Sequence, residues 1–302
     1  MDFSICGTIN LQSARLGVQI SSREIIVIFR QLFDATSSTY TYLIASRKGG
    51  EALIIDPVLE RVDRYIKLLD ELQLRLIKAI DTHVHADHLT GLGELRDRTR
   101  CITVMGEQSG VDVVSMRVAD SEKIEIEGIA LDTIYTPGHT SDSYSFLMGD
   151  RVFTGDTLLI RGTGRTDFQN GNPVDQYRSI FNRLLKLPDE TLIYPAHDYK
   201  GDTVSTIGEE KAFNPRLQVS SMQEYVDIMN SLNLPNPKMM DVAVPANLRV
   251  GLKQDLPQLR CQRRSKDASA GRSNNASGGA SRELCWGGLA AVGDQAWGVA
   301  AG

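Results

Sequence analysis

The feature that most constrains this chain is a cluster of metal-binding residue types that follows a short apolar segment at 75–80. Three of the five histidines and one aspartate of the 302-residue chain fall within six positions: His83, His85, Asp87 and His88. Imidazole and carboxylate groups hold Zn²⁺ or Fe²⁺ in proteins, and alternate residues of an extended loop point to one side. Packing alone would not gather four such groups, because each would need its own buried partner. The cluster therefore predicts a metal site.

The two remaining histidines and a further aspartate also follow short apolar segments. These residues are His139, Asp156 and His197. Gly155, directly before Asp156, allows the close approach of another backbone segment. Because loops at strand ends commonly present functional side chains, we expect all five histidines and both aspartates to lie in one site.

The pattern of apolar residues predicts a layered α/β domain. Short β-branched and aromatic segments predict strands at 25–33, 40–45, 52–55, 75–80, 124–126, 132–135, 144–148, 151–153 and 191–194. Helical spacing of apolar residues predicts helices over 58–72 and 174–187. Strands interleaved with helices are typical of a sheet covered by helices.

Composition divides the chain into three segments: a leader over 1–24, a folded domain over 25–252 and a tail over 253–302. The leader carries Arg15 and Arg23 among serines, which is loosely like a transit peptide and equally typical of a disordered extension. Of the 50 residues in the tail, 22 are Gly, Ala or Ser, which predicts disorder.

Charge, hydropathy and cysteine spacing exclude several classes of protein. The 33 basic and 38 acidic side chains give a net charge of -5, which disfavours nucleic acid as a partner. No apolar run approaches the ~20 residues that span a bilayer, so we expect no membrane span. The four cysteines are far apart and indicate neither a zinc knuckle nor a disulfide framework. A reducing intracellular compartment is therefore expected.

The ligand pattern resembles that of the metallo-β-lactamase superfamily, in which His-x-His-x-Asp-His is followed by a later His, an Asp and a final His. The resemblance covers 25–252 and implies a catalytic domain with an αββα sandwich, two sheets flanked by helices, with the metal at one sheet edge. It is less specific for the reaction, because one framework serves several chemistries. A metal-free binding module is disfavoured by the complete ligand set.

One reaction that fits is hydrolysis, since the chain resembles glyoxalase II type enzymes that act on S-lactoylglutathione. That resemblance implies two metal ions, zinc or a zinc and iron pair. One ion would be held by His83, His85 and His139, and the other by Asp87, His88 and His197, with Asp156 as a bridge. A hydroxide between the ions would attack the thioester.

The other reaction is an oxidation, since the chain also resembles the persulfide dioxygenases. That resemblance implies one Fe²⁺ per chain, held by His83, His139 and Asp156. Two histidines and one carboxylate leave up to three positions on an octahedral iron for O₂ and a substrate sulfur. Zn²⁺ is the alternative metal ion for this site. Four residues would then orient the ligands and waters: His85, Asp87, His88 and His197.

Segments outside the ligands favour the dioxygenase. Four of them resemble this family: 160–169, 214–216, 233–238 and 244–247. Glyoxalase II enzymes have a longer helical C-terminal region and usually a further histidine after Gly-His-Thr, where this chain has Ser-Asp-Ser at 141–143. We therefore expect an iron-dependent enzyme that oxidises glutathione persulfide with O₂ to sulfite and glutathione in sulfide catabolism.

The resemblance also implies residues that bind the substrate. Arg165 and Tyr199 match residues that contact glutathione in the family, and Arg161 and Thr140 are further candidates. An acidic protein must supply local cations for the two carboxylates of glutathione. Thr163 stands where family members carry a cysteine.

The resemblance leaves the wider context open. Both a monomer and a homodimer fit, and the compartment is the cytoplasm of a bacterial cell or, alternatively, the mitochondrial matrix. The tail of 50 residues is too short for a fused sulfurtransferase domain, so functional coupling to a separate sulfurtransferase is the expectation.

Overall fold

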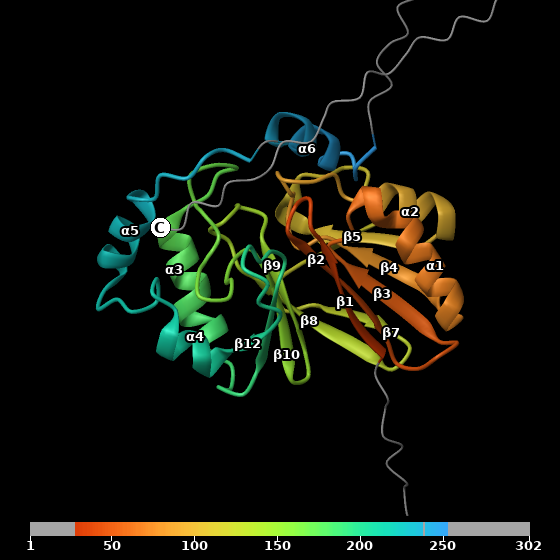
Figure 1. Cartoon of the computed structure of the whole chain (residues 1–302), viewed down its shortest axis with the longest axis horizontal. Helices are drawn as coiled ribbons and strands as arrows, with labels where there is room; N and C mark the ends of the chain where they lie inside the picture. Colours follow the sequence, from red (N-terminus) through yellow and green to blue (C-terminus); the bar gives the residue numbers. More distant parts are fainter. Residues whose placement is uncertain (1–27, 238, 253–302) are drawn as a thin grey trace, which may run out of the picture. The chain divides into compact units, whose positions relative to one another are not determined.

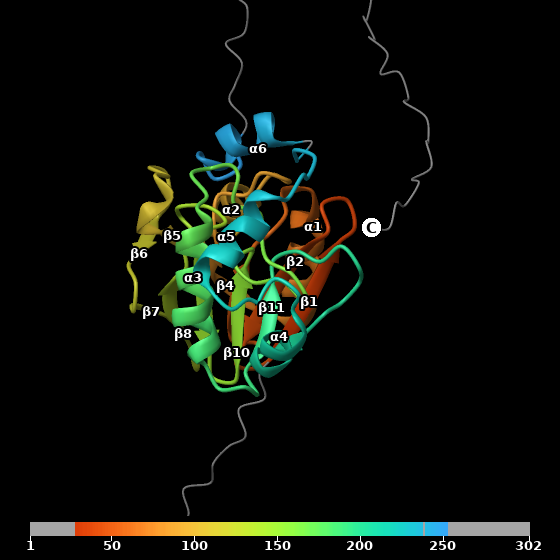
Figure 2. The ribbon, with the colours of Figure 1, turned by 90° about the vertical axis from the view of Figure 1, so that its left-hand side faces the viewer.

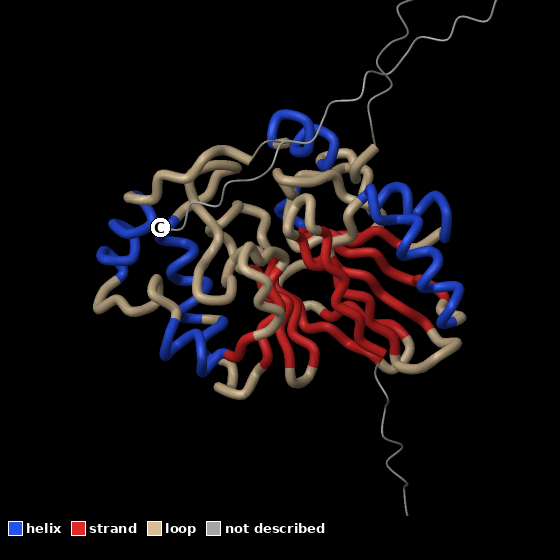
Figure 3. Tube along the Cα trace, in the orientation of Figure 1, coloured by secondary structure: helices blue, strands red, loops and turns tan. Residues whose placement is uncertain are grey.

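The computed structural model describes residues 28–237 and 239–252, which form two facing six-stranded sheets with helices on their outer faces (Figure 1). Figure 3 shows the strands together in the middle and the helices on either side of them. The predicted αββα sandwich of the α/β class is confirmed. The predicted leader and tail lie outside the described residues and stay predictions.

The first sheet has its strands in the order of the chain. They are β1 (Ile28–Asp34), β2 (Thr39–Ala45), β3 (Glu51–Ile55), β4 (Arg75–Ile80), β5 (Ile102–Gly106) and β6 (Met116–Val118). The first three pair antiparallel, and β3 through β6 pair parallel. The helices α1 (Val62–Leu72) and α2 (Leu92–Thr99) pack on this sheet. Short 3₁₀ helices occupy Leu59–Arg61 and Glu107–Ser109.

The second sheet runs in the reverse spatial order. Its strands are β7 (Lys123–Ile126), β8 (Ile129–Tyr135), β9 (Tyr144–Met148), β10 (Arg151–Gly155), β11 (Leu192–Pro195) and β12 (Ser205–Thr206). All neighbours pair antiparallel except β10 and β11, which are parallel. The helices at this sheet are α3 (Pro173–Asn182), α4 (Ile207–Phe213) and α5 (Met222–Asn230), seen in front of it in Figure 2. A 3₁₀ helix occupies Leu184–Lys186.

Three layers of apolar side chains hold these elements together. One lies between the first sheet and its helices, one between the two sheets, and one between the second sheet and its helices. Helix α1 shows why the sequence folds this way, because Val62, Tyr65 and Leu69 recur at helical spacing and are all buried. The last helix, α6 (Met240–Asn247), lies above the strand ends in Figure 1.

The predicted elements agree with the structure except where local sequence carries a weak signal. The strand at 75–80 is β4, whereas the helix predicted over 58–72 begins at Val62 after a 3₁₀ turn. The helix predicted over 174–187 ends at Asn182. Helix α2 was not predicted, because its eight residues include only two leucines among charged and small side chains. No helix among the described residues is long and apolar enough to cross a membrane.

Candidate metal centre and substrate cavity

The sheet topology brings the predicted ligands to one edge of the sandwich. Strands β8 and β10 both pair antiparallel with β9, and β10 is parallel to β11, so the carboxyl ends of all three strands lie at the same edge. His139, Asp156 and His197 follow these three ends. The loop of 81–91 leaves the end of β4 in the facing sheet and supplies the remaining four residues. All seven predicted ligands therefore meet in two adjoining groups.

The first group consists of His83, His139 and Asp156, which offer ligand atoms within 4.8 Å of one another. Nδ1 of His139 donates to the carbonyl oxygen of Arg165 at 2.7 Å. Nδ1 of His83 lies 3.0 Å from Oγ1 of Thr82. Because the Nδ1 atom of each ring is engaged, Nε2 of both histidines is left to bind a ligand. Nε2 of His139 lies 3.6 Å from Oδ2 of Asp156.

Charge in this group suits a bound cation. Burial holds the pKa of His83 well below its ordinary value, so the imidazole is neutral. Burial would raise the pKa of Asp156, but His197 and His139 outweigh it and lower that pKa. Neutral imidazoles and an ionised carboxylate are the protonation states in which these side chains bind metal ions. The donor set of the first group therefore fits a divalent cation.

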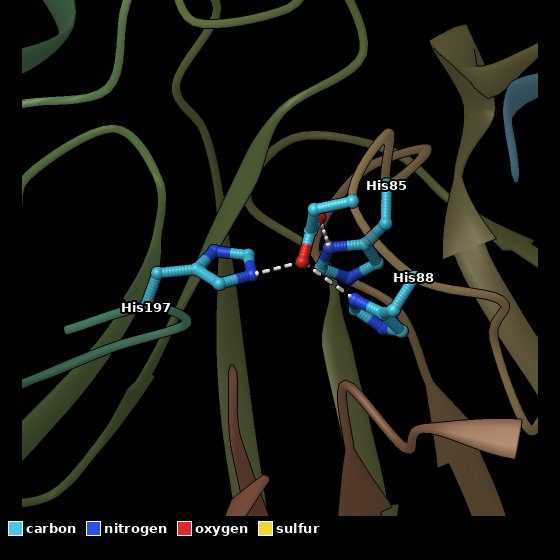
Figure 4. A group of neighbouring side chains, drawn as sticks. His85, His88 and His197 are labelled. Carbon is cyan, nitrogen blue, oxygen red and sulfur yellow. Dashed lines mark hydrogen bonds and ion pairs between the residues drawn. The ribbon is translucent and has the colours of Figure 1, made fainter. Parts of the chain in front are cut away.

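The second group contains His85, Asp87, His88 and His197. Figure 4 shows His197 facing His85 and His88. The carboxylate of Asp87 contacts all three rings. Oδ2 of Asp87 lies 2.7 Å from Nε2 of His197 and 3.0 Å from Nδ1 of His88. Nδ1 of His85 and Nε2 of His88 are buried and have no hydrogen-bond partner among the described residues.

His197 connects the two groups. Its Nδ1 atom lies 2.7 Å from Oδ1 of Asp156, and its Nε2 atom lies 2.7 Å from Oδ2 of Asp87. Burial opposes protonation of this ring, but the two carboxylates outweigh burial and hold its pKa well above the ordinary value. Because both nitrogens are engaged, His197 positions Asp156 so that its Oδ2 is left for the first group.

Sequence reasoning missed three residues that support the ligands from elements far away in the chain. Asp56 follows β3 and accepts hydrogen bonds from the backbone N–H and the hydroxyl of Thr82, at 2.7 and 3.1 Å. Thr39 begins β2, and its hydroxyl lies 3.1 Å from Nε2 of His197. The Asp56-Pro57 dipeptide by itself indicates only a turn. Parallel pairing of β3 with β4 puts Asp56 at the site, and this pairing depends on long-range contacts.

The third missed residue is Asn247, at the end of α6. Its side-chain amide donates to the carbonyl oxygens of His85 at 2.9 Å and His88 at 2.8 Å. Its carbonyl oxygen accepts the backbone N–H of Thr90 at 2.9 Å. The segment 244–247 had been noted for its resemblance to the family, with no role attached to it. In the structure, Asn247 of this segment holds the loop 81–91, called the ligand loop below, by these three hydrogen bonds.

A cavity of about 310 Å³ opens beside the two groups, within the range of small-ligand sites. Five of the seven candidate ligands line it: His83, Asp87, His139, Asp156 and His197. The segment 159–165 also lines it, and Phe168, Leu234 and Pro237 add apolar surface. The arrangement can hold a small organic molecule next to a cation.

Two of the residues predicted to bind substrate line the cavity but are already engaged. The guanidinium of Arg165 donates to Asp167 twice at 2.6 Å and to the carbonyl oxygen of Pro235 at 2.7 Å, and it stacks 3.9 Å from the ring centre of Phe168. The guanidinium of Arg161 is paired with Glu209 and Glu210.

The other two candidates differ in accessibility. Tyr199 lines the cavity with 70% of its surface exposed, and its ring stacks on that of His197 at 6.2 Å between centres. Thr140 is fully buried and hydrogen-bonds to the hydroxyl of Ser143 at 2.7 Å. It is not part of the cavity wall, so its predicted contact with the substrate has no support in the geometry.

Four side chains donate hydrogen bonds to the four consecutive backbone carbonyl oxygens of residues 162–165 in the cavity wall. The donors, in chain order of the carbonyls, are Asn214, Arg216, Gln176 and His139. Gln176 is itself fixed by the hydroxyl of Tyr225 at 2.8 Å. The wall and the ligand His139 are therefore parts of one hydrogen-bonded unit.

Comparison with known proteins gives consistent results. The sequence model described as "Metallo-beta-lactamase superfamily" matches residues 35–112 and 106–197. The human protein named "Persulfide dioxygenase ETHE1, mitochondrial" is 47% identical over 230 residues, which cover 75% of this chain and 90% of the human protein. The mouse protein of the same name is 46% identical over the same shares.

Solved structures agree with the sequence comparisons. The crystal structure of ETHE1 from Myxococcus xanthus is 52% identical, with a TM-score of 0.73 over 74% of this chain and all of that one. A metallo-β-lactamase from Staphylococcus aureus is 27% identical, with a TM-score of 0.70 over 74% of this chain and 73% of its own.

Proposed function

Because the chain belongs to the metallo-β-lactamase superfamily and, within it, to the family of the ETHE1 persulfide dioxygenases, we propose that it oxidises glutathione persulfide with one bound Fe²⁺. Glutathione persulfide, O₂ and water would give glutathione, sulfite and two protons. Removal of a persulfide sulfur as sulfite places the enzyme in sulfide catabolism.

The observation that carries this proposal is the convergence of His83, His139 and Asp156 at the cavity, each from a different strand-end loop. Thr82 and the Arg165 carbonyl engage Nδ1 of the two rings and so direct Nε2 towards the ligand position. Such a set fits Fe²⁺ and keeps positions open for a second ligand. When bound, the iron would supply the redox chemistry that activates O₂ beside the substrate sulfur.

The rest of the site would hold this triad in place. His197 binds Oδ1 of Asp156 and the carboxylate of Asp87, which fixes the direction of Oδ2. Val84 of the loop 81–91 packs in the apolar layer between the first sheet and its helices, and this contact and the hydrogen bonds from Asn247 would limit the movement of the loop. Tyr199, at the rim of the cavity, would contact the substrate.

A glyoxalase II type hydrolase is the second candidate, and the two buried nitrogens of His85 and His88 that lack partners favour it. That enzyme would need His85 in the same group as His83 and His139. Instead, Nε2 of His85 lies 3.1 Å from Oδ1 of Asp56, and His85 groups with the residues around Asp87. The geometry supports the site with one metal better.

One experiment separates the two reactions. The protein is loaded with Fe²⁺ without oxygen, and O₂ consumption with glutathione persulfide is compared with hydrolysis of S-lactoylglutathione. We expect about one iron per chain, O₂ uptake and sulfite formation. Thioester hydrolysis without O₂ uptake would contradict the dioxygenase, and a sample loaded with Zn²⁺ serves as the control.

The cellular context is part of the proposal. We infer a soluble protein of the bacterial cytoplasm, with the mitochondrial matrix as the alternative, and the mammalian relatives are named as mitochondrial proteins. The enzyme would work as a monomer or a homodimer and receive its substrate from a separate sulfurtransferase. Size-exclusion chromatography with light scattering tests the oligomeric state.

A further inference from the structure

The three residues of the first group come from two different sheets. His83 lies on the ligand loop, which leaves the first sheet, whereas His139 and Asp156 follow strands of the second sheet. The rings of His83 and His139 lie 5.0 Å apart between centres, at an angle of 86°. A metal ion tolerates a narrow range of ligand positions, so contacts between the two sheets at this edge must fix the placement of these residues relative to one another.

Val84, directly after His83, is tied to the second sheet through both of its backbone groups. Its N–H donates to Oδ2 of Asp142 at 2.9 Å, and its carbonyl oxygen accepts from Nε2 of Gln169 at 2.7 Å. The N–H belongs to the planar peptide between residues 83 and 84, and the carbonyl to the one between residues 84 and 85. Side chains from outside the ligand loop therefore hold both peptides that flank Val84.

Asp142 and Gln169 are in turn attached to the segment that carries His139. Asp142 is a buried residue of the loop between β8 and β9 and lies three positions after His139. The backbone carbonyl oxygen of Gln169 accepts the N–H of Ser141, next to Asp142, at 3.4 Å. The two side chains thus join the segment of His139 directly to the segment of His83.

We propose that Asp142 and Gln169 are positioning residues, which set the distance and direction of His83 relative to His139 and so the metal affinity of the first group. The identity of that metal ion rests on the proposed function. A carboxylate that accepts a backbone N–H makes a charge-assisted hydrogen bond, which is stronger than a neutral one. The carbonyl of Val84, a buried residue, needs a donor, and Gln169 supplies it.

A role in stability alone makes a different prediction. The backbone N–H of Tyr144 donates to the carbonyl oxygen of Thr82 at 2.9 Å, and the side chain of Val84 packs in the apolar layer of the first sheet. The ligand loop therefore stays attached when Asp142 or Gln169 is replaced. If the two residues only add stability, their removal should lower the free energy of unfolding and leave the geometry of a bound metal unchanged. If they position the ligand, that geometry changes as well.

The first test is the d–d absorption spectrum of the protein loaded with Co²⁺, because these bands depend on the arrangement of the ligands. Asp142→Ala removes the acceptor, and Gln169→Glu replaces the donor by an acceptor of the same shape. We expect both variants to shift the bands relative to wild type. Asp142→Asn, which keeps an acceptor oxygen, should have the wild-type spectrum. Identical spectra for wild type, Asp142→Ala and Gln169→Glu would overturn the proposal.

The second test is the dissociation constant for Fe²⁺, measured without oxygen by competition with a chelator. Asp142→Ala and Gln169→Glu should weaken binding about 10- to 100-fold, as is usual when a residue that orients a ligand is lost. Asp142→Asn should stay within about threefold of wild type. The control is Leu69→Ala, which leaves a cavity under α1 away from the ligand loop and should bind iron as wild type does. Equal weakening in Leu69→Ala would assign the effect to stability and contradict a positioning role.

Neither test needs turnover, so this proposal and the proposed function can fail separately. If wild type binds iron but consumes no O₂ with glutathione persulfide, the proposed function fails, and both tests still decide the role of Asp142 and Gln169. If wild type is active and the variants bind metal as wild type does, the positioning role fails while the proposed function stands. If Asp142→Ala does not fold, Gln169→Glu carries the same comparison.

Discussion

Nδ1 of His197 lies 2.7 Å from Oδ1 of Asp156, so the two residues at the ends of β10 and β11 form one buried unit. The parallel pairing of these strands puts the two side chains next to each other. The contact leaves Asp156 with a single free oxygen for the group that includes His83 and His139. We therefore propose that His197 positions a ligand and is not itself a ligand of the same ion.

This arrangement predicts different effects for the two residues. Asp156→Ala should lose its iron and its activity, because it removes one of three ligands. His197→Ala should retain most of its iron and lose about 10- to 100-fold in activity, as is usual when a residue that orients a ligand is removed. Iron content and O₂ uptake check this. Equal loss of metal in both variants would point to a two-metal site.

Asn247→Ala tests the brace between α6 and the ligand loop. Three hydrogen bonds would be lost, and the carbonyl oxygens of His85 and His88 would be left without this donor, so we expect a loss of about 2–4 kcal/mol in the free energy of unfolding. Iron should also dissociate faster to a chelator. Asn230→Ala, at an exposed position that ends α5, is the control. Unchanged iron dissociation in Asn247→Ala would refute the brace.

Arg165→Met tests the engaged arginine of the cavity wall. This guanidinium joins Asp167 to the backbone carbonyls of Leu234 and Pro235. Its removal should loosen the wall and lower kcat/KM about tenfold for charged and uncharged persulfides alike. A loss confined to glutathione persulfide would mean that Arg165 itself binds a carboxylate, as its resemblance to the family's contact residue suggests.

The pKa of Asp34, a residue away from the metal centre, predicts how the free energy of unfolding depends on pH. Burial raises the pKa of this carboxyl, but the backbone N–H of Ser37 and the guanidinium of Arg61 outweigh it, so the pKa lies below its ordinary value of 3.8. Because the folded-state pKa is lowered, the stabilisation is present above pH 3.8 and is lost as the pH falls below it. Asp34→Asn should cost about 1–2 kcal/mol at pH 7.

Urea unfolding of wild type and Asp34→Asn between pH 3 and pH 7 measures this difference. The two proteins should converge in stability as the pH falls, since protonation removes the charge from Asp34 in wild type. A difference that does not change with pH would show that the carboxylate charge contributes nothing. The turn that Asp34 closes leads into β2 and to Thr39 beside His197.

The candidate ligands and the layered α/β class could be predicted because their signals are local, whereas the αββα sandwich was implied by the family resemblance. Four ligands lie within six positions, and the others directly follow apolar segments, so chain order was enough to predict one site. The strand at 75–80 was predicted with its observed bounds, since it is a short, mostly apolar segment with two β-branched residues. Helix α2 and the C-terminal helices gave weaker patterns because they are short and packed by distant residues.

The sequence by itself determined the candidate ligand set, the layered α/β class and the acidic character of the chain, because residue identity and spacing specify these directly. The tertiary structure decided which of the candidate ligands lie in the same group and which side chains contact them. Asp56, Thr39 and Asn247 reach the site only through strand pairing and helix docking across 29 to 162 residues of chain. It also decided how the arginines of the cavity are held, since the ion pair of Arg165 with Asp167 and the hydrogen bonds of Arg216 to Thr163 depend on contacts that spacing does not encode.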